Sequence, residues 1–370
     1  MPKKASYWDY IRVEELLNLQ NGLEAQEQEV SNDEIRFIVI HQIDELWFKL
    51  VLRELATARD LFAKTHVPED ALAGAVQSLK RVTLCFELAA QHFRLMETMR
   101  TQDYLTFRDK LNPASGFQSA QMREIEILMG LDDSDRIPFG KEGSYLEALK
   151  SNDGSPSPAH ARVAKRRADT PTLKDAVRQW LYRTPIHGSL PDQDGDDDAV
   201  SSWVKSYYQG HQKLHERALR FAVEAQALTP ADEARLRTRY EGQLAGAQRH
   251  LDAEDVEPDQ RAFMRRLRAA ILFVDSNREL PLLSWPGAII DGLIECEQAM
   301  LAFRQRHARM VERVIGRRVG TGGSDGVAYL DQTALQYRVF TEIWAGRTLL
   351  LPPELSPPIQ NAAFYGLTQG

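Results

Sequence analysis

Two long stretches of helical periodicity near the N-terminus constrain the fold more than any other feature of the sequence. In residues 33–62 and again in residues 68–99, apolar side chains recur every three or four positions, which is the spacing of one face of an α-helix. The short polar segment THVPED separates the two stretches. We therefore expect an antiparallel pair of long helices with buried apolar faces. Ser31 or Asn32 is a suitable N-cap for the first of them.

The rest of the chain has the same helical character. We expect further helices at 118–129, 173–182, 203–227, 230–253, 258–273, from 285 or 286 to 315, and at 330–344. Alternating strand patterns with hairpin turns are almost absent, so the sequence predicts an all-α fold. No internal repeat stands out.

Two segments within 151–202 interrupt the helical pattern. Residues 151–171 and 190–202 are rich in Ser, Pro, Gly, Asp and charged side chains. Such segments bury little apolar surface, so we expect mobile loops there. Apolar helices resume on both sides without a clear domain boundary. We therefore expect residues 1–370 to form a single helical domain with a mobile insertion at about 151–202.

The composition excludes several classes of protein. The 370 residues carry 46 Lys+Arg and 53 Asp+Glu, a net charge of −7, whereas nucleic-acid binding needs a concentrated basic face. No eighteen-residue apolar run could span a membrane, and no apolar stretch follows the N-terminal lysines as in a secretory signal. We expect a cytoplasmic protein that binds neither nucleic acid nor membrane. Cys85 and Cys296 suit buried thiols better than a disulfide scaffold.

Two of the nine histidines stand within apolar helical stretches. His41 lies in FIVIHQIDELWFK and His307 in LAFRQRHARMVERVIG. Each could be a core histidine that is hydrogen-bonded to a helix neighbour, or an axial haem ligand that faces a cavity in a bundle. Spacing does not separate these alternatives. His211 and His215 have the i,i+4 spacing of a metal pair, but neither an HExxH motif nor a third ligand accompanies them.

Two further segments could bind a ligand. The glycines of GTGGSDG, residues 320–326, let the backbone approach a ligand, and Thr321 adds a hydroxyl. The segment lacks the Gly-Lys-Ser/Thr ending of a Walker loop, and a plain turn between helices is equally compatible with it. In DYLTFRDKLNPASGFQS, residues 103–119, Arg108 could clamp a carboxylate with its planar guanidinium or form a surface salt bridge.

Four segments, taken together and in this order, resemble the tryptophan 2,3-dioxygenase family of haem enzymes. They are YWDYIRVEELLNLQ at 7–20, NDEIRFIVIHQIDELWFK at 32–49, FRDKLNPASGFQSAQ at 107–121 and FRQRHARMVERVIGRRVGTGGSDGVAYL at 303–330. Weaker similarity covers most of the remaining chain. The resemblance implies a helical bundle of the tryptophan/indoleamine dioxygenase superfamily that encloses a haem. This would be haem b, because the CxxCH motif for covalent attachment is absent from the sequence.

The resemblance also implies roles for individual residues. His307 matches the axial ligand of the haem iron, and His41 matches the catalytic histidine that hydrogen-bonds the indole N–H. Tyr104 and Arg108 match the pair that binds the substrate carboxylate. Thr321 matches the contact to the substrate ammonium. The other matched positions are Phe37 in the substrate pocket, Ser115 and Gly322 near the haem, and Tyr7, Tyr10 and Ile11 in an N-terminal arm over residues 1–20.

In the family, that arm reaches into the pocket of a neighbouring subunit, which implies a homotetramer built as a dimer of dimers. The implied reaction is the opening of the indole ring of L-tryptophan by O2, which inserts both oxygen atoms across the C2=C3 bond. The product is N-formyl-L-kynurenine, in tryptophan catabolism by the kynurenine pathway.

Two departures from familiar members leave the function open. The chain has Asp325 in the glycine-rich loop where serine is familiar, and Phe303 where tryptophan is common. Asp325 is a candidate cause of altered substrate preference. The alternatives are a haem oxygenase that adds one oxygen atom to a substituted tryptophan or another aromatic amino acid, and a non-catalytic sensor, because a fold alone does not guarantee function.

Overall fold

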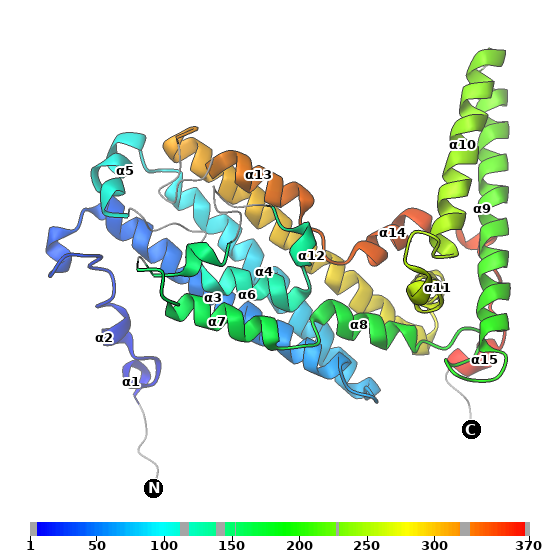
Figure 1. Ribbon diagram of the computed structural model, residues 1–370, viewed down its shortest axis with the longest axis horizontal. Coiled ribbons are helices and arrows are strands. Elements are labelled where there is room, and N and C mark those ends of the chain that lie inside the picture. The colour runs from blue at the N-terminus through cyan, green and yellow to red at the C-terminus, as the bar shows by residue number, and fades with distance from the viewer. Residues whose placement is uncertain are drawn as a thin grey trace, which may run out of the picture. The chain divides into compact units, whose positions relative to one another are not determined.

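The structure, a computed structural model, describes residues 6–111, 118–137, 145–151, 153–226, 229–318 and 326–366. Within these ranges the regular secondary structure is helical, and β pairing is confined to two isolated bridges (Figure 1). This confirms the predicted all-α class. None of the helices in these ranges is long and apolar enough to cross a membrane.

Fifteen α-helices occur in the described residues. They are α1 (Tyr7–Ile11), α2 (Val13–Leu16), α3 (Asn32–Phe62), α4 (Glu69–Met96), α5 (Thr101–Phe107), α6 (Ala120–Met129), α7 (Pro158–Ala168), α8 (Leu173–Tyr182), α9 (Asp196–Gln226), α10 (Pro230–Leu251), α11 (Arg261–Ser276), α12 (Pro281–Ile315), α13 (Gly326–Gln336), α14 (Thr341–Leu349) and α15 (Ala362–Tyr365). Short 3-10 helices include η2 (Arg108–Leu111) and η4 (Asp133–Asp135).

The predicted spans agree closely with α3, α4, α8 and α10, because local side chains decide the ends of these helices. At the start of α3, the Ser31 hydroxyl accepts the backbone N–H of Glu34 at 3.2 Å. At the start of α10, the Thr229 hydroxyl accepts the backbone N–H of Asp232 at 3.2 Å, and Pro230 takes the first helical position. Such caps satisfy N–H groups that have no partner within the helix.

The prediction of a loop over 151–171 is wrong from Pro158 to Ala168, where the structure has α7. The Ser157 side chain caps this helix by accepting the His160 N–H at 3.1 Å. Val163 is fully buried in a cluster that includes residues of the neighbouring α6. Because the segment is otherwise polar, its composition does not reveal this buried side chain, which packs α7 against α6 together with the Arg162–Glu124 ion pair.

The prediction of a loop over 190–202 is also wrong from Asp196 onwards, where α9 begins. The buried Asp196 carboxylate accepts two hydrogen bonds from Arg266 Nη1, at 2.7 and 2.8 Å, and one from the Ser189 hydroxyl at 2.8 Å. Charge-assisted hydrogen bonds of this kind stabilise the acidic N-terminus of α9. The acidic composition alone had predicted a solvated loop there. The mobility of the insertion stays a prediction.

The predicted helix over 330–344 is wrong as a single element. α13 ends at Gln336, and α14 begins at Thr341. Between them, the backbone N–H of Val339 donates to the Glu297 side chain, and the Tyr337 ring lies 4.9 Å from the Arg304 guanidinium carbon. These contacts to α12 replace the hydrogen bonds of a continuous helix.

The described chain divides into two compact units. Unit 1 contains Met1–Ala56, Lys80–Thr172 and Glu295–Val339, and unit 2 contains Thr57–Leu79, Leu173–Ile294 and Phe340–Gly370. Three of the boundaries between the units fall inside α3, α4 and α12, and the other two fall between helices, before α8 and before α14. The expected single domain stays a prediction.

The core of unit 1 is built around Phe303 of α12. Its ring centroid lies 5.3 Å from that of Phe93, 5.6 Å from Phe48 and 5.9 Å from Phe86. All four side chains are buried, and they come from α3, α4 and α12. Phe303 therefore fills a central place in this core. Cys85 and Cys296 are buried and free, as expected.

Unit 2 contains α8, α9, α10, α11 and α14, and within it α9 and α10 form a long hairpin (Figure 1). His211 of α9 hydrogen-bonds the Leu349 carbonyl at 2.9 Å, and His215 hydrogen-bonds the His211 carbonyl at 2.8 Å. Among the described residues, no group of three His, Cys, Asp or Glu side chains could hold a metal ion. His211 therefore links α9 to the end of α14, and the His215 ring contacts that of Tyr240 on α10, with centroids 5.3 Å apart.

Candidate functional site

His41 lies on α3, and its hydrogen bond fixes which ring nitrogen carries the proton. Nδ1 is 2.7 Å from the carbonyl oxygen of Phe37, one turn earlier. A carbonyl oxygen only accepts, so Nδ1 is the donor. Burial lowers the pKa of His41, outweighing the opposite effects of the Phe37 carbonyl and the Glu45 charge. The imidazole is therefore neutral near pH 7, and its Nε2 is an acceptor.

An aromatic wall stands next to His41. The Phe37 ring centroid is 4.1 Å from that of His41, 5.7 Å from Phe107 and 6.2 Å from Tyr104. Tyr104 and Phe107, both buried on α5, have centroids 5.3 Å apart. The structure thus brings three predicted residues together. Phe107 was missed, although its place one turn after Tyr104 is the signal that could have found it.

Arg108 follows directly after α5 and lies beside Tyr104. Burial raises the pKa of Tyr104, while the positive charge of Arg108 and a hydrogen bond between the two side chains lower it. The guanidinium can only donate, so the tyrosine oxygen accepts. The predicted pair is therefore formed in the structure. Together the two side chains offer a cation and a hydroxyl to a carboxylate.

His307 lies on α12 in an aromatic environment. Its ring stacks on Phe93, with centroids 5.2 Å apart and an interplanar angle of 17°, and it also stacks on Phe303 at 6.2 Å. Burial lowers the pKa of His307 to about 4, with additional effects from His41 and Arg304. A neutral imidazole has a free lone pair, which a metal ligand requires. The electrostatic effect of His41 also shows that these two histidines lie in one region of unit 1.

Some predicted site residues cannot be placed. Ser115, Thr321 and Gly322 lie outside the described residues, as does Asp325. Their roles stay predictions.

The predicted arm residues do not join His41 within the same chain. Tyr7 and Tyr10 are 72% and 81% exposed, and Ile11 is also exposed. They lie on α1, all of which is described and none of which is buried. Three aromatic or aliphatic side chains are thus available on the surface.

Two hydrogen bonds connect the segment after α2 to residues that neighbour His41 and Arg108 in sequence. The sequence analysis did not predict either of them. Gln42, the neighbour of His41 in sequence, accepts a hydrogen bond from Gln20 Nε2 at 2.8 Å. Lys110 of η2 donates to Glu24 at 2.7 Å. The segment that follows α2 is therefore attached both to α3 and to η2, which contains Arg108.

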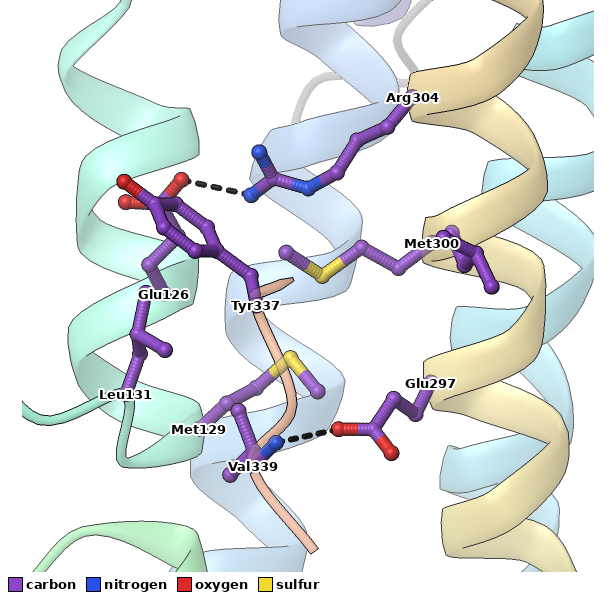
Figure 2. A pocket seen from close by; sticks show the side chains of 9 residues that line it. Glu126, Met129, Leu131, Glu297, Met300, Arg304, Tyr337 and Val339 are labelled. Carbon is purple, nitrogen blue, oxygen red and sulfur yellow. Dashed lines mark hydrogen bonds and ion pairs between the residues drawn. The ribbon is translucent and has the colours of Figure 1, made fainter. Parts of the chain in front are cut away.

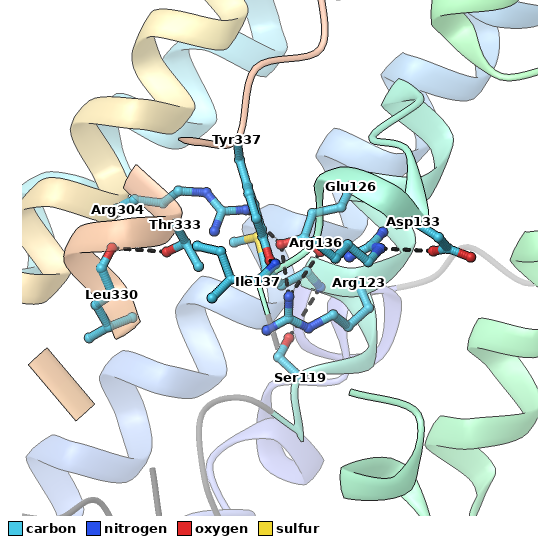
Figure 3. Close-up of polar contacts among 11 residues, drawn as sticks. Ser119, Arg123, Glu126, Asp133, Arg136, Ile137, Arg304, Leu330, Thr333 and Tyr337 are labelled. Atoms are coloured by element: carbon cyan, nitrogen blue, oxygen red, sulfur yellow. Dashed lines mark hydrogen bonds and ion pairs between the residues drawn. The ribbon is translucent and has the colours of Figure 1, made fainter. Parts of the chain in front are cut away.

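A buried ionic cluster is formed by residues of α6, of α12 and of the turn after η4 in the same unit. Glu126 accepts hydrogen bonds from the guanidinium groups of Arg123, Arg136 and Arg304 (Figure 3). Burial raises the pKa of Glu126, but the three positive charges outweigh burial and bring this pKa down to about 2. The carboxylate is therefore ionised at all ordinary pH values. No isolated sequence motif predicts this cluster, because Glu126 and Arg304 are distant in the chain.

Comparisons with known proteins identify the family of this chain. A family model described as tryptophan 2,3-dioxygenase matches residues 2–350. A tryptophan 2,3-dioxygenase from Sorangium cellulosum is 55% identical over 98% of this chain and 88% of its own length. Tryptophan 2,3-dioxygenase 2 from Ralstonia nicotianae is 51% identical over 99% of both chains, and the enzyme of that name from Bdellovibrio bacteriovorus is 32% identical over 96% of both. This chain therefore belongs to the tryptophan 2,3-dioxygenase family.

Proposed function

We propose that this protein is a haem-dependent dioxygenase that opens the indole ring of L-tryptophan with O2 and forms N-formyl-L-kynurenine, in the kynurenine pathway. Family membership supports the reaction. The observation that carries the proposal to this chain is the presence of two neutral, half-buried histidines on different helices, with a tyrosine–arginine pair near one of them. The names of the full-length relatives favour this reaction over the one-atom alternative.

The surroundings of His307 fit a residue that would hold the iron of haem b. Its imidazole is neutral down to a pKa of about 4 and is stacked on Phe93. Apolar rings exclude water and suit a porphyrin. When bound, the haem supplies the iron at which O2 reacts. Ser115 and Gly322 would lie near the haem by family resemblance.

The substrate would be held by its two polar ends and its ring. Arg108 and Tyr104 bind the carboxylate, and Thr321 contacts the ammonium. His41 Nε2, which is unprotonated because Nδ1 donates to Phe37, accepts the indole N–H. This hydrogen bond orients the ring while the proton stays on the indole.

Phe37 and Phe107 provide an apolar wall for the indole. Residues that hold a substrate in one orientation reduce the entropy that the reactants must lose to reach the transition state. The contribution of these side chains is therefore to position the ring carbons for reaction and to keep water away from them.

The exposed arm completes the proposal. Tyr7, Tyr10 and Ile11 would close the pocket of a neighbouring subunit within a homotetramer, a dimer of dimers. Their exposure supports this role, since apolar side chains on a short, unburied helix gain most from a partner. A cytoplasmic location stays a prediction.

The test uses purified, haem-loaded protein. We expect a Soret band that His307→Ala abolishes and that the control His215→Ala, in unit 2, retains. The ferrous protein with L-tryptophan and ¹⁸O₂ should yield formylkynurenine that carries two labelled atoms by mass spectrometry. One labelled atom would support the monooxygenase alternative. Bound haem and bound tryptophan without any product would contradict catalysis.

A further inference from the structure

The ionic cluster around Glu126 contains more positive than negative charge. Glu126 is 0% exposed, and its oxygens lie 2.9 and 3.0 Å from Arg123 Nη1, 2.6 Å from Arg136 Nη1 and 2.6 Å from Arg304 Nη2. One further buried carboxylate, that of Glu297, lines the adjoining pocket, where it accepts the N–H of Val339 (Figure 2). Three buried guanidinium groups thus face two buried carboxylates.

Other neighbours do not neutralise this excess. Asp133 also pairs with Arg136, but it is 55% exposed and is shared with Arg167, so water screens its charge. Tyr337 and Tyr145 present uncharged rings to Arg304 and Arg136, at 4.9 and 4.5 Å.

Each of the three guanidinium groups also keeps a buried nitrogen without a hydrogen-bond partner. In the part of the chain that the structure describes, these are Nε of Arg123, Nη2 of Arg136 and Nε of Arg304. Burying positively charged groups whose N–H donors lack hydrogen-bond partners makes the free energy of folding less favourable. A cost of this kind suggests that the charge serves a purpose other than stability.

Arg304, a member of the cluster, lies on the same helix, α12, as the proposed iron ligand His307. Arg304 precedes His307 by three residues, which is about one helical turn. Its positive charge contributes to lowering the pKa of His307. Water is largely excluded here, so the field of the cluster is weakly screened. A field that disfavours a proton on this imidazole also disfavours any other added positive charge at the same place.

We propose that the arginine cluster of Arg123, Arg136 and Arg304 raises the reduction potential of the iron held by His307. The inference rests on the proposed function, because it requires bound haem. Ferric iron takes up one electron to become ferrous and thereby loses one positive charge. Nearby positive charge stabilises the ferrous state, which is the state that reacts with O2. The cluster shifts this equilibrium and supplies no electron itself.

Two variants that remove opposite charges from the same cluster, and that both break the Arg304–Glu126 pair, distinguish this electrostatic role from a structural one. Arg304→Met removes a positive charge, so we expect a lower potential. Glu126→Gln removes a negative charge and keeps the shape of the side chain, so we expect a higher potential. For each, a change of about tenfold in the ferrous-to-ferric ratio corresponds to about 59 mV for a one-electron couple. A disturbance of packing alone would shift both variants in the same direction.

Two controls complete the set. Arg304→Lys keeps the charge and loses the forked geometry, so its potential should stay near that of the unmodified protein. Arg309→Met removes a positive charge from the same helix, but Arg309 is 48% exposed and is paired with Glu312 and Asp331. Solvent screens this charge, so we expect no shift.

The reduction potential is measured by a redox titration of the full-length, haem-loaded protein with dithionite, followed at the Soret band. Shifts of opposite sign in the first two variants support the proposal. Shifts of the same sign, or no shift, overturn it. If Arg304→Met fails to fold, Arg136→Met tests the same sign. If the unmodified protein binds no haem, the proposed function itself fails, which is a different result.

Discussion

The buried carboxyl group of Asp44 should cost the protein stability near neutral pH. Asp44 lies on α3 of unit 1, and burial raises its pKa from 3.8 to about 8, with a smaller contribution from the Glu45 charge. His92 Nδ1 is 3.5 Å from Asp44 Oδ1, and among the described residues neither atom has a hydrogen-bond partner. Burial also lowers the pKa of His92, so the imidazole is neutral and compensates little.

The magnitude follows from proton linkage. At pH 7 the unfolded chain has an ionised Asp44, whereas the folded protein holds the protonated form. About three pKa units separate 3.8 from pH 7, and each is worth about 1.36 kcal/mol, so folding pays about 4 kcal/mol for this group. Because the folded pKa is raised, the stability contribution is fully present below pH 3.8 and is lost as the pH rises towards 8.

The variant Asp44→Asn removes this cost, since an amide has a similar shape and needs no proton. We expect its free energy of unfolding at pH 7 to exceed that of the unmodified, haem-free protein by up to about 4 kcal/mol. At pH 4 the difference should shrink to under about 1 kcal/mol. Urea titrations at both pH values, with unchanged m-values, measure the two differences.

Asp60→Asn is the matched control. Asp60 lies on the same helix but is 67% exposed and pairs with Arg59, so its replacement should change stability by under about 1 kcal/mol at either pH. The reasoning is refuted if Asp44→Asn destabilises the protein at pH 7, or if its effect is the same at both pH values. Either result would mean that Asp44 is ionised and paired with a protonated His92.

Three further outcomes are expected. Burial holds the pKa of His307 at about 4, below its ordinary 6.5, so the stability that this one group contributes to the haem-free protein should be fully present above pH 6.5 and be lost as the pH falls towards 4, as measured by thermal melts. Arg108→Met should raise KM for L-tryptophan at least tenfold and leave the Soret band unchanged, and an unchanged KM would contradict its carboxylate contact. Phe107→Ala should cost about 3–5 kcal/mol of stability in urea titrations, whereas the exposed Phe221→Ala should cost under about 1 kcal/mol.

The helices were largely readable from the sequence. α3, α4, α8 and α10 begin and end where apolar periodicity and capping residues place them, because each helix depends on hydrogen bonds between residues four apart. The same regularity puts Phe37 and His41 on one face of α3. Recognition of the family then depended on four segments in a fixed order.

The exceptions are places where a distant residue overrides the local pattern. α7 forms because Val163 is buried against α6, and the break after Gln336 forms because Glu297 accepts a backbone N–H that a helix would otherwise use. Local composition contains no information about either partner.

The same distinction holds at the site. The sequence contained His41, Tyr104, Arg108 and His307 as candidates, but their protonation states depend on burial, which only the packed helices produce. The proton on Nδ1 of His41 follows from one contact at 2.7 Å. The arginines around Glu126 come from separate segments, α6, the turn after η4 and α12, and folding alone brings their charges together. Electrostatic energies depend on distance in space and on the exclusion of water, and neither is a property of the order of residues along a chain.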